Sequence, residues 1–173
     1  MSSPRLTTTS YAVLGLLERC QPATPYQLKQ AAQISLFHFW TITHTQLYTE
    51  CARLAEAGLL DEKREEGGRR RRVYSLAPAG LEALGRWRDS PDTDLYELRD
   101  PGLLKLFCGA DPASLAETQL ERHEQRLALY RQLAADGEAL PEGMRLALEA
   151  GTGHEREYVR FWSELSDRGR AEP

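Results

Sequence analysis

Apolar side chains near the start of the chain recur at the spacing of an α-helix. Tyr11, Leu14 and Leu17 predict a helix over residues 9–20. A second helix is predicted over residues 24–33, because its first residues combine a capping threonine, a proline at the first helical position and a glutamine three residues after the cap. The aromatic run that follows has no clear period, so it is either a buried connection or an extension of this helix.

A third helix is predicted to begin at Thr43, which forms a second capping box with Gln46. Gly58 supplies the left-handed residue that follows many helix ends. Two short extended runs, residues 59–65 and 71–76, flank a Gly-Gly turn and predict a β-hairpin. The apolar positions of the third helix are Leu47, Cys51 and Leu54.

After the hairpin, the pattern predicts one more short helix and then two long ones. Pro78 begins the short helix, and residues 91–101 are polar, acidic and proline-bearing, which is typical of a linker. Asp111 and Pro112 begin the first long helix, and the second begins near Glu142. The short helix is expected to bury Leu81, Leu84 and Trp87.

The two long helices carry apolar stripes. Positions on the first step by three and four residues over about three heptads, which is typical of a coiled-coil seam. A pair of antiparallel helices this long is expected to pack on a partner. The first stripe is Ala113, Ala116, Leu120, His123, Leu127, Tyr130 and Ala134, and the second is Leu148, Gly151, His154, Tyr158, Phe161, Trp162 and Leu165.

We therefore expect a mainly α-helical fold with one small β-hairpin, divided into residues 1–90, a linker at 91–101, and residues 102–173. Three helices followed by a hairpin is the element order of a winged helix-turn-helix. In that fold the third helix enters a DNA major groove and the hairpin reaches an adjacent groove or the backbone.

The distribution of charge changes the picture that composition gives. The chain of 173 residues has a formal net charge of -4, which by itself argues against binding to a phosphate backbone. Up to Ser90, however, it holds 12 basic and 9 acidic side chains, a net +3, and beyond Ser90 it holds 10 and 17, a net -7. Four of the basic residues are consecutive, at 69–72, so the positive field is local to the hairpin.

Spaced motifs in the first half resemble the PadR family of bacterial transcriptional regulators. The matching runs are Thr45-Gln46-Leu47-Tyr48, then Leu54 to Leu60, then Gly67 to Gly80, which includes the basic wing and a tyrosine before the fourth helix. The segment LLKLFCG at 103–109 and the two long helices look like the helical dimerisation region of the longer, Vir-type members. The family usually has threonine where this chain has Ala77, so the cap of the fourth helix is expected to be weaker by about 1 kcal/mol.

The winged order and the resemblance together imply a dimeric transcriptional repressor that binds a pseudo-palindromic, double-stranded DNA operator and is released by a small-molecule effector. Short polar and amide side chains on the third helix suit contact with base edges, and wing arginines suit phosphates. The residues expected to contact DNA are His44, Thr45, Gln46, Tyr48, Thr49, Lys63, Arg69, Arg70, Arg71 and Arg72.

Two further groups of residues are assigned by the same interpretation. Dimerisation is expected to use Leu120, His123, Leu127, Tyr130, Tyr158, Phe161, Trp162 and Leu165. The aromatic cluster Phe37, Phe39 and Trp40 lines an effector pocket or, as the plainer alternative, belongs to the core between the two halves.

Other classes of protein find little support. No stretch approaches the about 20 apolar residues of a membrane span, and no signal-peptide pattern is present, so a cytoplasmic protein is expected. Three distant cysteines predict reduced thiols, and we expect no metal, no cofactor and no enzymatic activity, because catalytic and phosphate-binding motifs are missing. The alternatives are a winged helix that docks proteins without binding DNA, and a small-molecule-binding protein built on the aromatic cluster.

Overall fold

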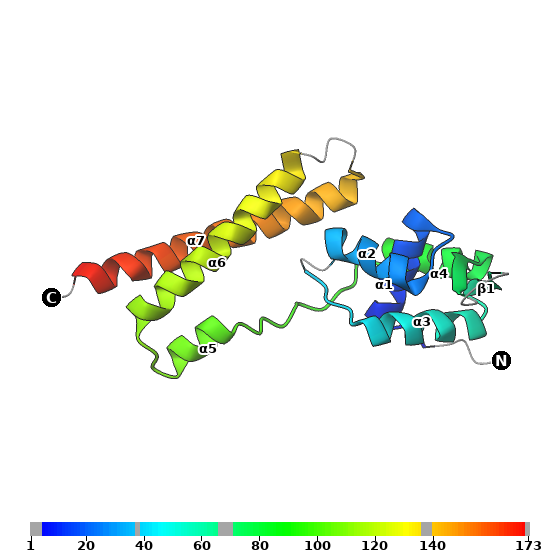
Figure 1. The fold of residues 1–173 in the computed structure, drawn as a ribbon, viewed down its shortest axis with the longest axis horizontal. Helices are drawn as coiled ribbons and strands as arrows, with labels where there is room; N and C mark the ends of the chain where they lie inside the picture. The colour runs from blue at the N-terminus through cyan, green and yellow to red at the C-terminus, as the bar shows by residue number, and fades with distance from the viewer. Residues whose placement is uncertain (1–4, 37–38, 66–70, 136–139, 172–173) are drawn as a thin grey trace. The chain divides into compact units, whose positions relative to one another are not determined.

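A computed structural model describes residues 5–36, 39–65, 71–135 and 140–171 of the chain. The protein folds into two compact units, and each is described by itself below (Figure 1). Unit 1 comprises residues 1–94 and unit 2 residues 95–173. The predicted fold class, mainly helical with a small antiparallel hairpin, is confirmed.

Unit 1 contains the four predicted short helices and the hairpin in the predicted order. The elements are α1 (Thr8–Cys20), α2 (Pro25–Ser35), α3 (His44–Glu56), β1 (Leu60–Arg64), β2 (Arg72–Leu76) and α4 (Pro78–Asp89).

Capping boxes define where α1, α2 and α3 begin. In α3 the Thr43 hydroxyl accepts a hydrogen bond from the Gln46 amide, and the Gln46 side chain accepts one from the Thr43 amide at 2.8 Å. Thr24 and Gln27 do the same at the start of α2, as predicted. These reciprocal bonds satisfy donors that a helix start otherwise leaves without partners, so the sequence alone locates these two starts.

The wing is a short sheet held to the helices by a third stretch of chain. β1 and β2 pair antiparallel, with Leu60 opposite Leu76 and Arg64 opposite Arg72. Ala23, just before α2, forms an antiparallel bridge with Tyr74, with backbone N–H to oxygen distances of 3.0 and 2.9 Å. The hairpin is therefore anchored at its middle to the connection between α1 and α2.

The core of unit 1 gathers apolar side chains from every element. The predicted face of α3 is buried, whereas that of α1 is buried at Leu14 and Leu17 and only partly buried at Tyr11. Ile42, before the α3 cap, is buried in the same cluster as Leu47. Gly58 has a φ of 73°, which places the left-handed residue where the sequence predicts it. The fully buried larger members are Val13, Leu14, Leu17, Leu28, Leu47, Cys51, Leu54, Tyr74 and Leu84.

The predicted apolar face of α4 is wrong at two of its three positions. Leu84 is buried, but Leu81 is 52% exposed and Trp87 is 46% exposed. The core side of α4 is formed instead by Gly80, Ala83 and Leu84, because small residues let the helix approach the sheet closely. Trp87 covers the surface of α1, with its ring stacked on Tyr11 at a centroid distance of 4.7 Å.

The start of α4 has no side-chain cap, which agrees with the weaker cap expected from Ala77. Ala77 has the extended backbone of an N-cap, with φ -79° and ψ 160°, but no side-chain hydrogen bond. Ala77→Ser is therefore expected to raise the free energy of unfolding by about 1 kcal/mol. Urea denaturation of the two proteins checks this, and a variant no more stable than wild type would show that the buried site has no room for the hydroxyl.

Unit 2 is built on two long helices. Its elements are α5 (Pro101–Phe107), α6 (Pro112–Ala135) and α7 (Glu142–Ala171), and α6 and α7 run antiparallel along one another (Figure 1). Asp111 caps α6, as predicted, by accepting a hydrogen bond from the Ser114 amide at 2.8 Å. Asp100 caps α5 through the amides of Gly102 and Leu103.

The seam between α6 and α7 contains a buried polar group beside its apolar contacts. Glu155 is 2% exposed, its Oε2 lies 2.6 Å from His123 Nδ1, and its Oε1 lies 3.6 Å from Arg126. The ring of Tyr158 lies against that of His123, at a centroid distance of 4.7 Å. Because Glu155 has cationic and hydrogen-bonding partners on α6, the group fixes how the two helices align.

Within the described ranges, no helix is both long enough and apolar enough to cross a membrane.

Candidate nucleic-acid interface

The outer face of α3 presents polar side chains to solvent. Leu47, Cys51 and Leu54 point into the core, so the remaining positions of the first two turns point outward. All five residues predicted to contact DNA from this helix are exposed. They are His44, Thr45, Gln46, Tyr48 and Thr49.

Gln46 and Tyr48 already interact with other residues at the start of α3. The Gln46 carbonyl oxygen is used by the capping bond, so its amide N–H groups are the donors that remain for a ligand. The Tyr48 ring lies against that of His44, with centroids 4.4 Å apart, and remains 43% exposed. The Tyr48 ring therefore lies on the exposed outer face of α3.

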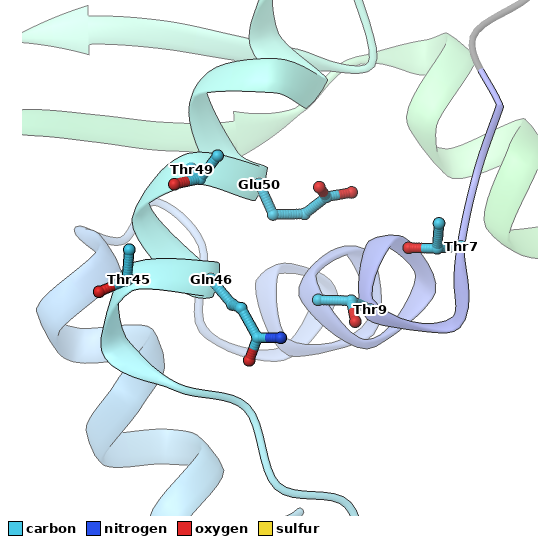
Figure 2. A pocket seen from close by; sticks show the side chains of 6 residues that line it. All are labelled: Thr7, Thr9, Thr45, Gln46, Thr49 and Glu50. Carbon is cyan, nitrogen blue, oxygen red and sulfur yellow. The ribbon is translucent and has the colours of Figure 1, made fainter.

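A shallow hollow of about 270 Å³ separates α3 from the start of α1 (Figure 2). Thr45, Gln46, Thr49 and Glu50 line it from α3, while the other wall consists of threonines at the start of α1. The Glu50 carboxylate points across the hollow toward that second wall (Figure 2). The α1 wall, which comprises Thr7 and Thr9, was not predicted, because no local pattern links residues so far apart in the chain.

The wing contributes cationic side chains of two kinds. Arg72 Nη1 lies 3.5 Å from Glu62 Oε2, and Arg64 Nε lies 3.4 Å from Glu62 Oε1, so one carboxylate serves two arginines. Arg71 and Lys63 are exposed, and neither forms an ion pair with another described residue. Arg69 and Arg70 lie outside the described residues.

The wing cations therefore differ in how readily they could meet a phosphate. Arg72 and Arg64 are both held by the Glu62 carboxylate of the same hairpin. Arg64 lies beside Lys63 on β1.

The residues predicted for dimerisation fall into two groups by burial. Leu127 is 5% exposed, Tyr130 is 3% exposed and Trp162 is fully buried within the single chain. The Tyr130 ring lies against Gly151 of α7, and the Trp162 ring lies beside Gly102 of α5, so these side chains are used within one chain. The partly exposed members, which have surface left for a second chain, are Leu120, His123, Tyr158, Phe161 and Leu165.

The described members of the aromatic cluster are exposed on unit 1. Phe39 is 64% exposed and Trp40 is 39% exposed, and Phe37 lies outside the described residues. Neither Phe39 nor Trp40 lines the hollow between α1 and α3 or a second hollow beside the wing. Their assignment to an effector pocket stays a prediction.

The three cysteines are free thiols that differ in burial. Cys51 is buried, and burial together with the neighbouring Glu50 charge raises the pKa of its thiol to about 12, which opposes thiolate formation at neutral pH. Cys20 and Cys108 are free thiols as well. Within the described ranges, no three His, Cys, Asp or Glu side chains are grouped to hold a metal ion.

Three helices, an exposed polar face on the third, and a basic hairpin beside it define a winged helix-turn-helix domain. Residues 13–86 match the Transcriptional regulator PadR-like family.

Known proteins with similar sequences and structures cover most of the chain. Negative transcriptional regulator PadR of Bacillus subtilis (strain 168) is 26% identical over 167 residues, covering 87% of this chain and 91% of that protein. The crystal structure of Bacillus subtilis PadR in complex with operator DNA has a TM-score of 0.81 at 22% identity, covering 94% of this chain and 99% of the other. The virulence activator AphA of Vibrio cholerae has a TM-score of 0.68 at 25% identity, covering 96% and 100%.

Proposed function

We propose that the protein is a homodimeric transcriptional repressor that binds a pseudo-palindromic operator through α3 and the wing. The observation that carries this proposal is the outward, polar face of α3 beside a hairpin with exposed cations. His44, Thr45, Gln46, Tyr48 and Thr49 would face base edges, while Lys63 and Arg69 to Arg72 would face phosphates.

Selection from random sequence tests DNA binding and finds the operator motif in one experiment. The purified protein is used to enrich duplexes from a randomised library. We expect an inverted repeat whose half-sites lie about one helical turn apart, roughly 34 Å, or a multiple of it. A library that shows no enriched motif would contradict the proposal and favour the alternative of a protein-docking winged helix.

The dimer is proposed to form through unit 2. α6 and α7 bury their main seam inside one chain, yet the unit leaves Leu104, Phe107, Leu129 and Leu146 more than 40% exposed. Apolar side chains in such number on a helical unit suit contact with a second copy. Sedimentation equilibrium of the full chain is expected to give twice the protomer mass of 19.6 kDa.

Release by a small molecule is the regulatory part of the proposal. A crystal structure of Bacillus subtilis PadR contains p-coumaric acid, which supports an effector of that general kind here. Phe37, Phe39 and Trp40 remain the predicted contacts. A ligand that raises the melting temperature and also weakens the mobility shift of the selected duplex would support this, whereas a thermal shift without any DNA binding would favour a small-molecule-binding protein.

Such a regulator acts by binding alone, so we propose that it is not an enzyme. It would act in the bacterial cytoplasm, where the genomic DNA lies.

Glu62 provides a separate test of the wing. Glu62→Gln removes a negative charge from the proposed DNA surface and frees Arg64 and Arg72 from their shared ion pair. The affinity for the selected duplex is expected to rise roughly two- to fivefold, the range of a surface ion pair. Fluorescence anisotropy measures this, with Asp61→Asn, one position along β1, as the control for net charge. An equal gain in both variants would show that the ion pair does not restrain the arginines.

A further inference from the structure

Arg53, near the end of α3, uses most of its hydrogen-bonding capacity inside unit 1. Its Nε donates to Glu50 Oε2 at 2.9 Å, and its Nη2 donates to Glu50 Oε1 at 2.6 Å and to Ser10 Oγ at 2.9 Å. Its Nη1 donates to the Arg5 carbonyl oxygen at 3.2 Å. Four of the five guanidinium N–H groups are thus committed to the protein's own chain.

Two of the partners of Arg53 lie outside α3, namely Ser10 in the first turn of α1 and Arg5 just before that helix. Ser10 is fully buried, and its Oγ also accepts a hydrogen bond from the Thr7 amide at 2.8 Å, as part of the α1 capping box. A polar side chain buried this completely is costly to leave without partners. The guanidinium therefore joins the recognition-helix candidate α3 to the first turn of α1 through a buried anchor.

The pair of Arg53 and Glu50 stays charged in this setting. The hydrogen bond from Arg53 lowers the pKa of the Glu50 carboxyl below its ordinary value, and the same bond raises the pKa of Arg53. Glu50 lines the hollow between α1 and α3, where its carboxylate would otherwise repel a phosphate backbone. Arg53 therefore also neutralises the one carboxylate among the described residues that line the hollow.

The hydrogen bonds that run from Glu50 through Arg53 and Ser10 to Thr7, here called the Arg53 bridge, connect the two walls of the hollow. Thr7, at one end, and Glu50, at the other, line it together with Thr45, Gln46 and Thr49 (Figure 2). The angle at which α3 leaves the core decides where these polar side chains lie. The pair with Glu50 lies within α3 and holds the guanidinium in place, and the hydrogen bonds from Arg53 to Ser10 and to the Arg5 carbonyl restrain that angle.

We propose that Arg53 is a positioning residue for DNA recognition, fixing α3 against the start of α1 so that its outer face meets base edges in one register. The inference rests on the proposed function of α3. This positioning role differs from direct contact with DNA. To bind a phosphate, the Arg53 guanidinium would have to release hydrogen-bond partners that it holds within its own chain.

The test compares sequence discrimination with phosphate contact. Arg53→Met keeps the aliphatic stem and removes the bridge, and Ser10→Ala removes the α1 anchor at a buried site that DNA cannot reach. Arg86→Met, which breaks an exposed ion pair with Glu82 on α4, is the matched control. For each protein, affinity is measured by anisotropy for the duplex selected by the wild type and for sheared genomic DNA, over a range of salt.

Both Arg53→Met and Ser10→Ala are expected to lower the ratio of selected to non-specific affinity roughly tenfold, the scale of one misplaced base contact. The slope of log affinity against log salt should stay that of the wild type, and Arg86→Met should change neither. Loss of folded protein lowers the apparent affinities for the selected and the non-specific DNA by the same factor. A role of Arg53 in stability alone would therefore leave their ratio unchanged.

Two results would overturn the inference while leaving the proposed function intact. An unchanged ratio in both variants would show that the bridge does not position α3. A slope that falls in Arg53→Met alone, by about 0.9 for each protomer or about 1.8 for the dimer, would show that Arg53 contacts a phosphate directly. If the wild type selects no duplex at all, the proposed function fails, and the inference fails with it.

Discussion

Replacing Arg69, Arg70, Arg71 and Arg72 together with alanine is expected to reduce affinity for the selected duplex by roughly two orders of magnitude. Arg71 and Arg72 are exposed on a hairpin that is anchored to the α1–α2 connection. If two of the four arginines meet phosphates in each protomer, a dimer binds four phosphates through its wings. The salt slope should then fall by about 0.9 for each phosphate that is no longer bound, or about 3.6 in all.

The control for this experiment removes arginines of the same unit that lie away from the wing. Arg86 and Arg88, on α4, pair with Glu82 and Glu18. Alanine at both positions should leave the salt slope unchanged. Equal slopes for the wild type and the wing variant would show that the wing does not contact the DNA backbone.

Gly80→Ala is expected to destabilise unit 1 by about 3 kcal/mol, the upper range for overpacking a well-packed site. A Cβ built on Gly80 would lie 2.1 Å from the carbonyl oxygen of Leu59, a backbone atom that also accepts a hydrogen bond from the Ala77 amide. The clash can be relieved only by moving α4 away from the start of β1. Wing and helix would then lose their shared packing.

Gly85, further along α4, provides a matched control for Gly80. A Cβ there meets nothing within 4 Å, so Gly85→Ala should stabilise the protein by about 0.5–1 kcal/mol through helix propensity. Urea denaturation followed by circular dichroism measures both variants. Similar stabilities for the two would contradict the close approach of α4 to Leu59.

Local signals in the sequence were sufficient to predict the elements of unit 1. The boxes at Thr24 and Thr43 locate two helix starts, and Gly58 marks where α3 ends, because each depends on atoms only a few residues apart. The face of α4 was predicted wrongly for the opposite reason. The apolar period alone places Trp87 in the core. The actual close approach of α4 to Leu59 is possible because Gly80 has no side chain.

The features of the fold and of the candidate site that could not be predicted from the sequence depend on contacts between segments far apart in the chain. The seam on α6 is apolar, but period does not say whether Leu127 and Tyr130 meet the same chain or a second one, and the structure shows that α7 covers them. The link from Arg53 to Ser10 spans 43 positions and joins two polar residues without any repeating pattern. The second wall of the hollow in Figure 2 escaped prediction in the same way.

Whether α3 and the wing together form the DNA-binding surface can be decided by mapping that surface in solution. Amide chemical shifts of the isotope-labelled full chain are followed while the selected duplex is added. We expect the largest changes on residues 43–49 and on Lys63, Arg71 and Arg72, with small changes along α6 and α7. Changes concentrated on α2 or on unit 2, with α3 and the wing unaffected, would show that DNA binds elsewhere.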